Sequence, residues 1–373
     1  MFILLQGRVD NMQILQLTLF QIRKQITSLS FIAITAVFVI FAETQMGKLF
    51  HYPVKNNADI VSLNERGGDV KEYLYIKASP EELKINTIDY LNKIISQNQM
   101  EEEDANVFKN LIYRMDNENL SFDKAYEIIA KENPELLPWL DACRNQFQQK
   151  LGNVDEINNN IKLTLDEKGY NIIFSQKYVT YIQLISAFLI LPLFLILFTN
   201  DSRSNINEII YVQPIGSIRY ILCKYFSCLI PILLILYILG ETMNFYVAYK
   251  FKTSGWQADY SGFLSYYITF IVPTILFLSS LIMFLLLLLK KAIAVFPLYI
   301  LYVIFNATQG AFSGHSTSNA IYKCIIRLTS ENPYNNFIPL NRALYIVVSV
   351  FLIGFSCMLY KNSRKNSRRS ITL

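Results

Sequence analysis

Apolar residues are bunched along this chain into runs long enough to cross a membrane. A transmembrane helix needs about 20 apolar residues to span roughly 30 Å of hydrocarbon. The pattern predicts an all-α polytopic membrane protein with six transmembrane helices. The predicted spans cover residues 27–46, 178–199, 219–240, 264–289, 292–310 and 343–360.

The first run is the weakest of these spans, because its unbroken apolar core, residues 29–42, is short and Glu43 follows it. A secretory signal peptide is the alternative, since Arg23 and Lys24 precede the run. A membrane span is preferred, because no small-x-small cleavage site follows Ala42 and the preceding segment is long for a signal peptide.

The segment before the first span, Met12 to Ile26, mixes apolar side chains with glutamines and basic residues. This pattern predicts an amphipathic elbow helix that lies in the headgroup plane and then turns into the bilayer. An early extension of the first span is the alternative. We expect residues 1–50 to form one domain made of this helix and the first span.

A long polar region separates the first two spans. Residues 51–176 are too many for a connecting loop, so they predict a mainly helical extracytoplasmic domain of their own. Ser79 followed by Pro80 and acidic residues is a typical helix start. Helices are expected over 80–95, 101–113, 122–130 and 134–150, with an extended return over 161–174. The first of these helices should turn inward Ile85, Ile88, Leu91, Ile94 and Ile95.

Charge is divided unevenly between the polar region and the rest of the chain. Residues 51–176 hold 14 basic and 22 acidic residues, a net charge of −8, whereas the remainder is +13. The positive-inside rule therefore places both termini in the cytoplasm and residues 51–176 outside. The third domain, residues 177–373, would hold spans two to six, a cytoplasmic loop over 200–218 and a basic tail. The expected cytoplasmic basic residues are Arg8, Arg23, Lys24, Arg203, Arg219, Lys224, Lys290, Lys291, Lys361, Arg364, Lys365, Arg368 and Arg369.

Motifs for catalysis and nucleotide binding are absent from the sequence. There is no G-x-x-x-x-G-K-[ST], HExxH or GxSxG, and the chain has two histidines. The five cysteines have no metal-ligand spacing, although pairing of Cys143 with Cys324 stays open. We expect no catalytic site, metal or cofactor in this chain, and its charge does not point to nucleic acid.

A polar loop, Asp201 to Lys224, separates the second and third spans. Its middle, Asn205 to Val212, places isoleucines on one face and Asn207 with Glu208 on the other, which predicts a short helix along the membrane surface. Pro214 and Gly216 should end that helix, and Ser217 should cap the next one.

The sequence of this polar loop resembles a known family. Glu208, then Gln213 to Arg219, then Cys223-Lys224-Tyr225 at the head of a span are similar to the cytoplasmic loop of ABC-2 type transporter permeases. The six spans, the elbow and the segment Glu331 to Tyr345 also fit that family. The resemblance implies a coupling helix whose contacts with an ATPase would come from Asn205, Glu208, Ile209, Gln213, Pro214, Ile215, Gly216, Ser217 and Arg219.

The resemblance also implies a function and partners. The chain would be the permease subunit of an ATP-driven exporter in the bacterial cytoplasmic membrane, paired with a second copy of itself. Two copies of a cytoplasmic ABC ATPase would hold ATP and Mg. Re-entrant helices would lie within residues 310–339, and prolines would help the spans to bend. These prolines are Pro192, Pro231, Pro273 and Pro297.

The cargo is inferred from the character of the spans and of the external domain. Aromatic, nearly uncharged spans favour an amphipathic or hydrophobic substrate. An acidic external domain attracts cationic peptides, which favours export of, or protection against, an antimicrobial peptide. Export of lipid, drug or sodium is an alternative within the family. A membrane receptor with an external ligand-binding domain and a cytoplasmic docking loop is the alternative outside it.

Overall fold

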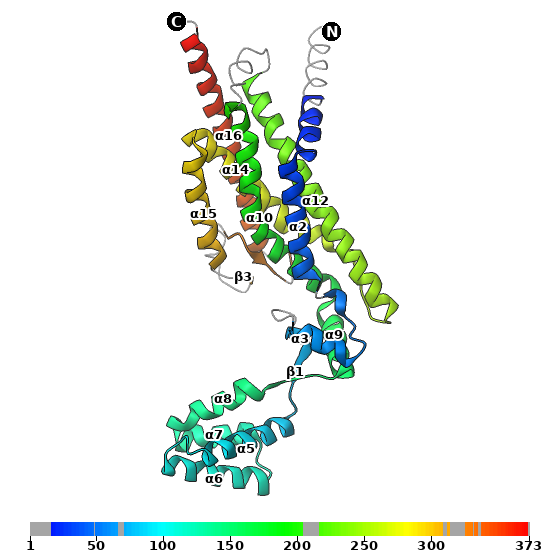
Figure 1. Cartoon of the computed structure of the whole chain (residues 1–373), viewed down its shortest axis with the longest axis vertical. Helices are drawn as coiled ribbons and strands as arrows, with labels where there is room; N and C mark the ends of the chain where they lie inside the picture. Colours follow the sequence, from blue (N-terminus) through cyan, green and yellow to red (C-terminus); the bar gives the residue numbers. More distant parts are fainter. Residues whose placement is uncertain are drawn as a thin grey trace. The chain divides into compact units, whose positions relative to one another are not determined.

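The structure is a computed structural model that describes residues 16–47, 49–65, 71–203, 216–308, 312–313, 325–330, 332–334 and 337–371. Internal contacts divide the chain into two compact units (Figure 1). The helical domain is His51–Thr164, and the membrane unit combines Met1–Phe50 with Leu165–Leu373.

The membrane unit is built from long apolar helices. Among the described residues, five helices are long and apolar enough to cross a membrane. These helices confirm an all-α, multi-pass membrane protein. They are α2 (Leu29–Met46), α10 (Tyr170–Arg203), α12 (Ser217–Thr253), α13 (Phe263–Tyr266) continued through η4 (Tyr267–Ile271) into α14 (Val272–Leu289), and α16 (Phe337–Ile371).

The fifth predicted span, residues 292–310, is not confirmed, so the structure has five of the six predicted spans among its described residues. Its residues form α15 (Ala292–Thr308), whose apolar part, Ala292–Asn306, is shorter than the other candidate spans. Lys290 ends α14 in the left-handed backbone conformation (φ 56°), so α14 and α15 are joined by a tight turn.

The elbow orientation before α2 is not confirmed either. Residues 16–26 are helical, and Ser28 starts α2 by accepting a hydrogen bond from the Phe31 amide at 3.3 Å. Figure 1 shows residues 16–26 following on from α2 in nearly the same direction, which favours the alternative of an early extension of the first span.

Three of the membrane helices, α10, α12 and α16, are longer than the apolar runs predicted. Helix α10 begins at Tyr170 rather than 178, and α12 continues to Thr253 rather than 240. Thirty-seven residues make α12 about 55 Å long, which exceeds the hydrocarbon thickness. Aromatic packing holds the extensions together, because the Tyr170 ring contacts Phe174 at 5.9 Å and Phe251 at 5.7 Å.

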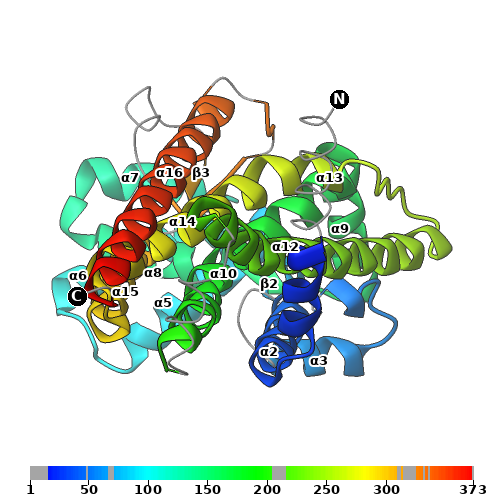
Figure 2. The same ribbon diagram turned by 90° about the horizontal axis from the view of Figure 1, so that it is seen from above.

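Helices α10 and α14 form the centre of the membrane unit. Helix α10 packs against α2, α12, α14 and α15, while α14 packs against α16 (Figure 2). Buried hydroxyl groups join neighbours: Tyr299 donates to the Ala187 carbonyl at 2.8 Å, and Tyr225 lies 2.8 Å from the Ser279 hydroxyl. The hydroxyl groups of Tyr299 and Tyr225 are thus satisfied between helices.

Prolines occupy two kinds of position in these helices. Pro192, Pro231 and Pro297 lie inside α10, α12 and α15, respectively. Pro273 instead lies in the first turn of α14, directly after the π-helical turn η4. Because α13, η4 and α14 continue as one span, Pro273 also lies within a continuous helix and, like the other three prolines, provides no amide for the hydrogen bond to the preceding turn.

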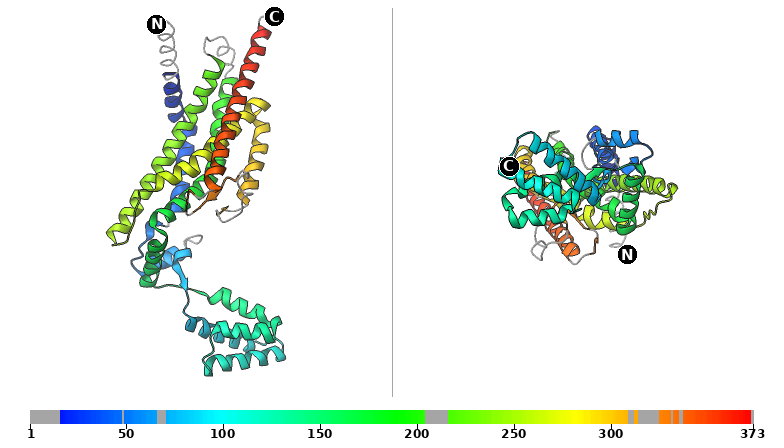
Figure 3. Two further views of the ribbon diagram at one scale, coloured as in Figure 1. Left: turned by 180° about the vertical axis from the view of Figure 1, so that it is seen from behind. Right: turned by 90° about the horizontal axis from the view of Figure 1, so that it is seen from below.

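The helical domain contains the helices that the sequence predicted. They are α5 (Pro80–Ser96), α6 (Glu102–Asn117), α7 (Phe122–Glu132) and α8 (Leu137–Phe147), the last preceded by η3 (Pro134–Leu136). Ser79 and Glu82 form a complete capping box at α5. These helices pack side by side around Phe108, Met115 and Leu140 (Figure 3). The expectation for Ile85 is wrong, since half of that side chain is exposed (50%).

The remaining elements of the helical domain were not foreseen. They are α3 (Asn57–Glu65), α4 (Lys71–Leu74), the antiparallel strands β1 (Tyr75–Lys77) and β2 (Gln149–Leu151), and α9 (Val154–Lys168). The extended return predicted over 161–174 is wrong, because α9 and α10 cover it. Ile157, Ile161 and Leu165 recur at helical spacing and are buried, and only Gly169 (φ 84°) interrupts the two helices.

Candidate functional site

The predicted coupling residues fall into two groups. Six of the nine lie outside the described residues, namely Asn205, Glu208, Ile209, Gln213, Pro214 and Ile215. Gly216, Ser217 and Arg219 are described and form the start of α12. They form part of what we term the loop base. Its other members are Phe198 of α10, Tyr220 and Lys224 of α12, and Tyr360 and Arg364 of α16.

Ser217 has a different role from the predicted one. Gly216 occupies the N-cap position of α12 in an extended conformation, and Ser217 is the first helical residue, so the prediction of a Ser217 cap is wrong. Its hydroxyl oxygen instead accepts a hydrogen bond from Arg364 Nη1 of α16 at 3.4 Å. The first turn of α12 is thereby linked to a residue 147 positions away.

Aromatic rings and cations strengthen the loop base. The Tyr220 ring stacks on Tyr360 of α16, with centroids 5.8 Å apart and planes at 22°. Lys224 Nζ lies 5.3 Å from the centre of the Phe198 ring of α10 and 5.8 Å from that of Tyr220. Lys224 and Arg364 are each only 5% exposed. Cation–π contacts of this kind contribute about 0.5–2 kcal/mol each, so α10, α12 and α16 are joined where the polar loop begins and ends.

Arg219 differs from these buried cations. Its side chain is exposed, and its aliphatic stem lies beside Gly216. Figure 1 shows the end of α10, the start of α12, the α14–α15 turn and the end of α16 at the same end of the membrane unit. The fold therefore gathers helix ends that are rich in Lys and Arg on one side of the membrane unit.

A second polar feature lies inside the membrane unit. Residues 325–330 are not helical, and β4 (Leu328–Thr329) pairs in parallel with β3 (Phe312–Ser313). The fully buried amide of Gln183 in α10 replaces a strand neighbour: Oε1 accepts from the Leu328 amide at 3.0 Å, and Nε2 donates to the Leu328 carbonyl at 3.1 Å. Both backbone groups of Leu328 are therefore satisfied by one side chain.

Arg342 of α16 holds the same segment from the other side. Its guanidinium donates to the Ile325 carbonyl at 3.3 Å and lies 4.7 Å from the centre of the Tyr345 ring. The Tyr345 hydroxyl donates to the same carbonyl at 2.7 Å. Arg342 is only 2% exposed. Irregular backbone in a membrane bundle is tolerated only where protein groups bond it, and Gln183, Arg342 and Tyr345 do so here.

The re-entrant helices expected within residues 310–339 are only partly open to test. Most of that stretch lies outside the described residues. Of the remainder, 337–339 belong to α16, and 312–313, 325–330 and 332–334 are not helical, with β3 and β4 as short strands among them. Sequence reasoning missed Gln183 as a structural residue. The available signal was a lone amide within a long apolar run, which in a span is a site hypothesis by default.

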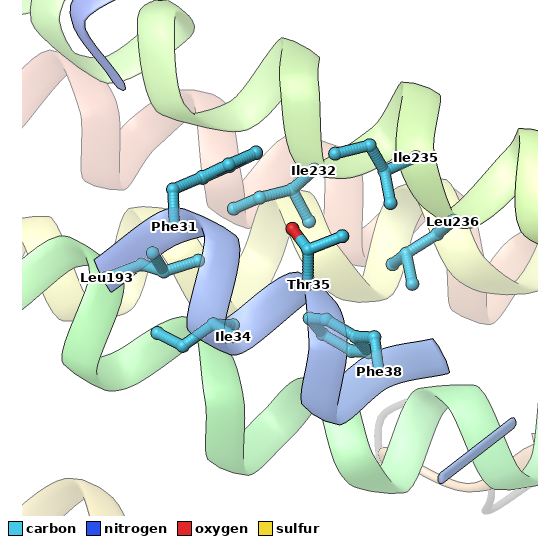
Figure 4. Close-up of a pocket in the computed structure, with 8 residues that line it drawn as sticks. All are labelled: Phe31, Ile34, Thr35, Phe38, Leu193, Ile232, Ile235 and Leu236. Atoms are coloured by element: carbon cyan, nitrogen blue, oxygen red, sulfur yellow. The ribbon is translucent and has the colours of Figure 1, made fainter. Parts of the chain in front are cut away.

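A small apolar pocket lies between α2, α10 and α12. Figure 4 shows side chains from the three helices around it, with Thr35 carrying the one hydroxyl among them. The lining residues are Phe31, Ile34, Thr35, Phe38, Leu193, Ile232, Ile235 and Leu236. Its interior volume of about 10 Å³ is roughly the room that one water molecule needs, so the pocket is too small for a peptide.

The described residues contain no candidate metal site. Within the described part of the chain, no three His, Cys, Asp or Glu side chains lie together as metal ligands. Cys143 is a buried thiol of α8, and burial raises its pKa to about 12, while Cys324 lies outside the described residues.

Comparison with protein-family models, curated proteins and solved structures found no match.

Proposed function

We propose that this chain is the permease subunit of an ATP-driven exporter of the ABC-2 type. The polar loop would receive movement from a separate ATPase and pass it to the membrane helices. The observation that carries the proposal is the loop base, where the loop joins α10 and α12 directly and where Arg364 and Tyr360 of α16 hold the first turns of α12.

The loop base suits transmission of a force. Helices α10 and α12 contain 34 and 37 residues, so a displacement of their loop ends is carried across the whole bilayer. Because Lys224 packs on Phe198, the ends of the two helices move together rather than independently. Pro192 and Pro231 interrupt the hydrogen bonding of these helices at mid-length, where bending would open a path.

The proposal defines the partners and the orientation. Two ABC ATPase subunits would supply the ATP and Mg sites and would bind on the side of the Lys- and Arg-rich helix ends, which the positive-inside rule assigns to the cytoplasm. A second copy of this chain would complete the transport path in the bacterial cytoplasmic membrane. The net charge of −8 in residues 51–176 favours a cationic, amphipathic peptide as cargo.

Co-purification tests this proposal most directly. The tagged chain would be purified in mild detergent and its partners identified by mass spectrometry. A stoichiometric partner with a Walker A motif and ATPase activity is expected. A preparation without an ATPase would contradict the proposal, and recovery of a kinase would favour the receptor alternative.

Coupling is tested with variants of the polar loop. Glu208→Gln combined with Arg219→Gln should leave membrane insertion intact but separate ATP hydrolysis from transport. Lys365→Gln is the matched control, because Lys365 is an exposed cation of α16 outside the polar loop. If ATP hydrolysis and transport stay coupled in the double variant, the polar loop does not transmit movement from the ATPase.

A further inference from the structure

One face of α12 is exposed along much of the helix, and its chemistry changes from one end to the other. In the middle of the helix this face carries aliphatic side chains at four-residue spacing, namely Ile230, Leu234 and Ile238. Glu241 does not interrupt the face, because its Oε2 atom is buried and Asn244 bonds to its carboxylate. Exposed aliphatic side chains of a span lie in the hydrocarbon core of a bilayer. This stripe therefore marks the part of α12 that hydrocarbon surrounds.

The stripe ends in aromatic side chains near the end of α12 that lies opposite to the loop base (Figure 1). Phe245, Tyr246 and Tyr249 continue the same face, and each is more than half exposed. The Tyr260 ring, from the turn after the helix, lies 5.8 Å from that of Phe245. Lys252 Nζ lies 4.9 Å from the centre of the Tyr260 ring. We term these five side chains the aromatic cluster.

Charged side chains limit how far this end of α12 can enter the hydrocarbon. Lys252 is exposed, and so is Asp259 in the turn between α12 and α13. Hydrogen bonds from the Ser261 amide and hydroxyl lower the pKa of Asp259, and the charge of Lys252 lowers it further. Ionised side chains are costly within hydrocarbon. The turn after α12 therefore lies among headgroups or in water.

The spacing along α12 matches the thickness of a bilayer. Phe226, an exposed aromatic residue near the loop base, and Tyr246 are twenty positions apart, which is about 30 Å along the helix. The hydrocarbon core is also roughly 30 Å thick. Transmembrane helices tilt by about 20° on average, which reduces this height by only about 2 Å. With Phe226 at one edge of the hydrocarbon, Tyr246 reaches the other edge and Tyr249 lies about 5 Å beyond it.

Contacts between α12 and the first span support the same boundary. Helix α2 contains 18 residues and is about 27 Å long. Just before α2, Gln25 Nε2 donates to Cys228 Sγ at 3.9 Å. Just after α2, the Phe50 ring contacts Tyr246 with centroids 5.3 Å apart, and the Phe50 carbonyl accepts a hydrogen bond from Lys250. The two helices therefore begin and end their apolar parts at matching levels.

We propose that the aromatic cluster binds the phospholipid headgroup layer on the side of the membrane opposite to the loop base. Aromatic side chains that carry a polar group are enriched at this level, because the ring contacts acyl chains while the hydroxyl bonds to headgroups and water. Lys252 can keep its aliphatic stem beside the rings and its ammonium group among the phosphates. Lipid is the occupant because the cluster continues the stripe of Ile230, Leu234 and Ile238, which hydrocarbon surrounds.

This lipid contact is independent of the proposed ATPase partner. The cluster belongs to the membrane unit of this chain and lies at the opposite end of α12 from the polar loop. Lipid contact and coupling to an ATPase can therefore succeed or fail separately.

Fluorescence quenching by brominated lipid tests the level of the cluster. The chain has two tryptophans, Trp139 and Trp256, and replacing both with Phe removes tryptophan emission. Tyr249→Trp then places a single probe in the cluster. Ile238→Trp is the matched control, since it lies on the same exposed face eleven positions away, about 16 Å along the helix. Both full-length variants would be reconstituted in vesicles of phosphatidylcholine brominated either near the glycerol end of the acyl chains or near the bilayer centre.

The two probes should respond in opposite order. Bromine near the glycerol end should quench Tyr249→Trp about twice as strongly as bromine near the centre, because interfacial rings lie at headgroup level. Ile238→Trp should be quenched more strongly by bromine near the centre. Tyr246→Trp replaces the first probe if Tyr249→Trp does not fold.

Two results would overturn the proposal. Stronger quenching of Tyr249→Trp by bromine near the centre would place the cluster within the hydrocarbon core. Absence of quenching by either lipid would mean that lipid does not cover the cluster. The emission maximum would then identify the occupant, since a short wavelength indicates a second copy or another protein and a long wavelength indicates water.

Discussion

The helical domain and the membrane unit treat their polar groups in opposite ways. In the helical domain, Lys150 of β2 forms ion pairs with Glu82 at 2.6 Å and Glu156 at 3.1 Å, at the partly exposed surface. In the membrane unit, Gln183 and Arg342 are buried and bond to backbone groups of an extended segment. The Lys150 ion pairs therefore adjust stability in the first unit, whereas the bonds of Gln183 and Arg342 fix the course of the backbone in the second.

The difference follows from the surroundings of each unit. Water competes for exposed ion pairs, so each contributes little. An apolar bundle offers no competing water, so an unsatisfied group there carries its full desolvation cost. The following substitutions test this contrast, from the largest expected effect to the smallest.

Phe108→Ala should have the largest effect, because it removes a fully buried ring from the core of the helical domain. The expected loss of stability is about 3–5 kcal/mol. Hydrogen exchange of the full-length chain should show faster exchange in α5 to α8 and unchanged exchange in α14. Equal acceleration in both units would mean that they unfold as one and would remove the basis of the comparison.

Gln183→Leu should destabilise the membrane unit by about 1–3 kcal/mol, because it removes the bonds that its side chain makes with the Leu328 amide and carbonyl, and only the amide has a second partner, the Ile326 carbonyl at 3.2 Å. Thermal unfolding in detergent measures this effect. Gln176→Leu, at a partly buried position of the same helix, is the control and should change stability little. An equally small effect of both variants would show that the extended segment does not depend on Gln183.

Tyr360→Ala should weaken the loop base by about 0.5–1.5 kcal/mol through loss of the stacked Tyr220 contact. A double-mutant cycle with Tyr220→Ala isolates that contact. Additive effects of the two substitutions would mean that α12 and α16 are not coupled through these rings.

Lys150→Met should have the smallest effect at neutral pH and should act mainly on pH dependence. Hydrogen bonds from Lys150 and from Ser79 lower the pKa of Glu82 to about 2, and bonds from Asn153 and Lys150 lower that of Glu156. A lowered carboxylate pKa stabilises the fold above the ordinary value near 4.5 and ceases to do so as the pH falls toward 2.

Unfolding midpoints between pH 6 and 2 measure this dependence. The wild-type helical domain should lose stability across that interval, and Lys150→Met should lose less. The Lys150 pKa is raised in turn by Glu82 and Glu156, so its own contribution is complete below its ordinary value and is lost only in strong alkali. If wild type and Lys150→Met lose stability equally between pH 6 and 2, Lys150 does not cause the lowered pKa values of Glu82 and Glu156.

Local signals predicted much of the helical domain. The capping box of Ser79 and Glu82 and the spacing of Leu91 and Ile94 lie within single helices, so a few neighbouring residues contain the information. The same local reasoning failed for Ile85, since the exposed side of a helix depends on what packs against it. It also failed at residues 161–174, where alternation of side chains was given more weight than the helical spacing of Ile157, Ile161 and Leu165.

The candidate sites were less accessible to sequence reasoning. The polar loop was predicted from its composition, and Gly216, Ser217 and Arg219 do lie at the start of a long helix. The contacts of the loop base were not predictable, because Ser217 and Arg364 are 147 positions apart.

The sequence by itself determined that this chain enters a membrane, because burial of long apolar runs depends on composition alone. It also indicated where α5 to α8 lie, although not α3, α4 and α9. Only the tertiary structure decided that residues 325–330 are not helical and lie inside the bundle and that α12 continues to Thr253. The partners that stabilise these features, Gln183, Arg342 and Tyr170, are distant in sequence, and hydrogen bonds between distant residues leave no periodic pattern in the chain.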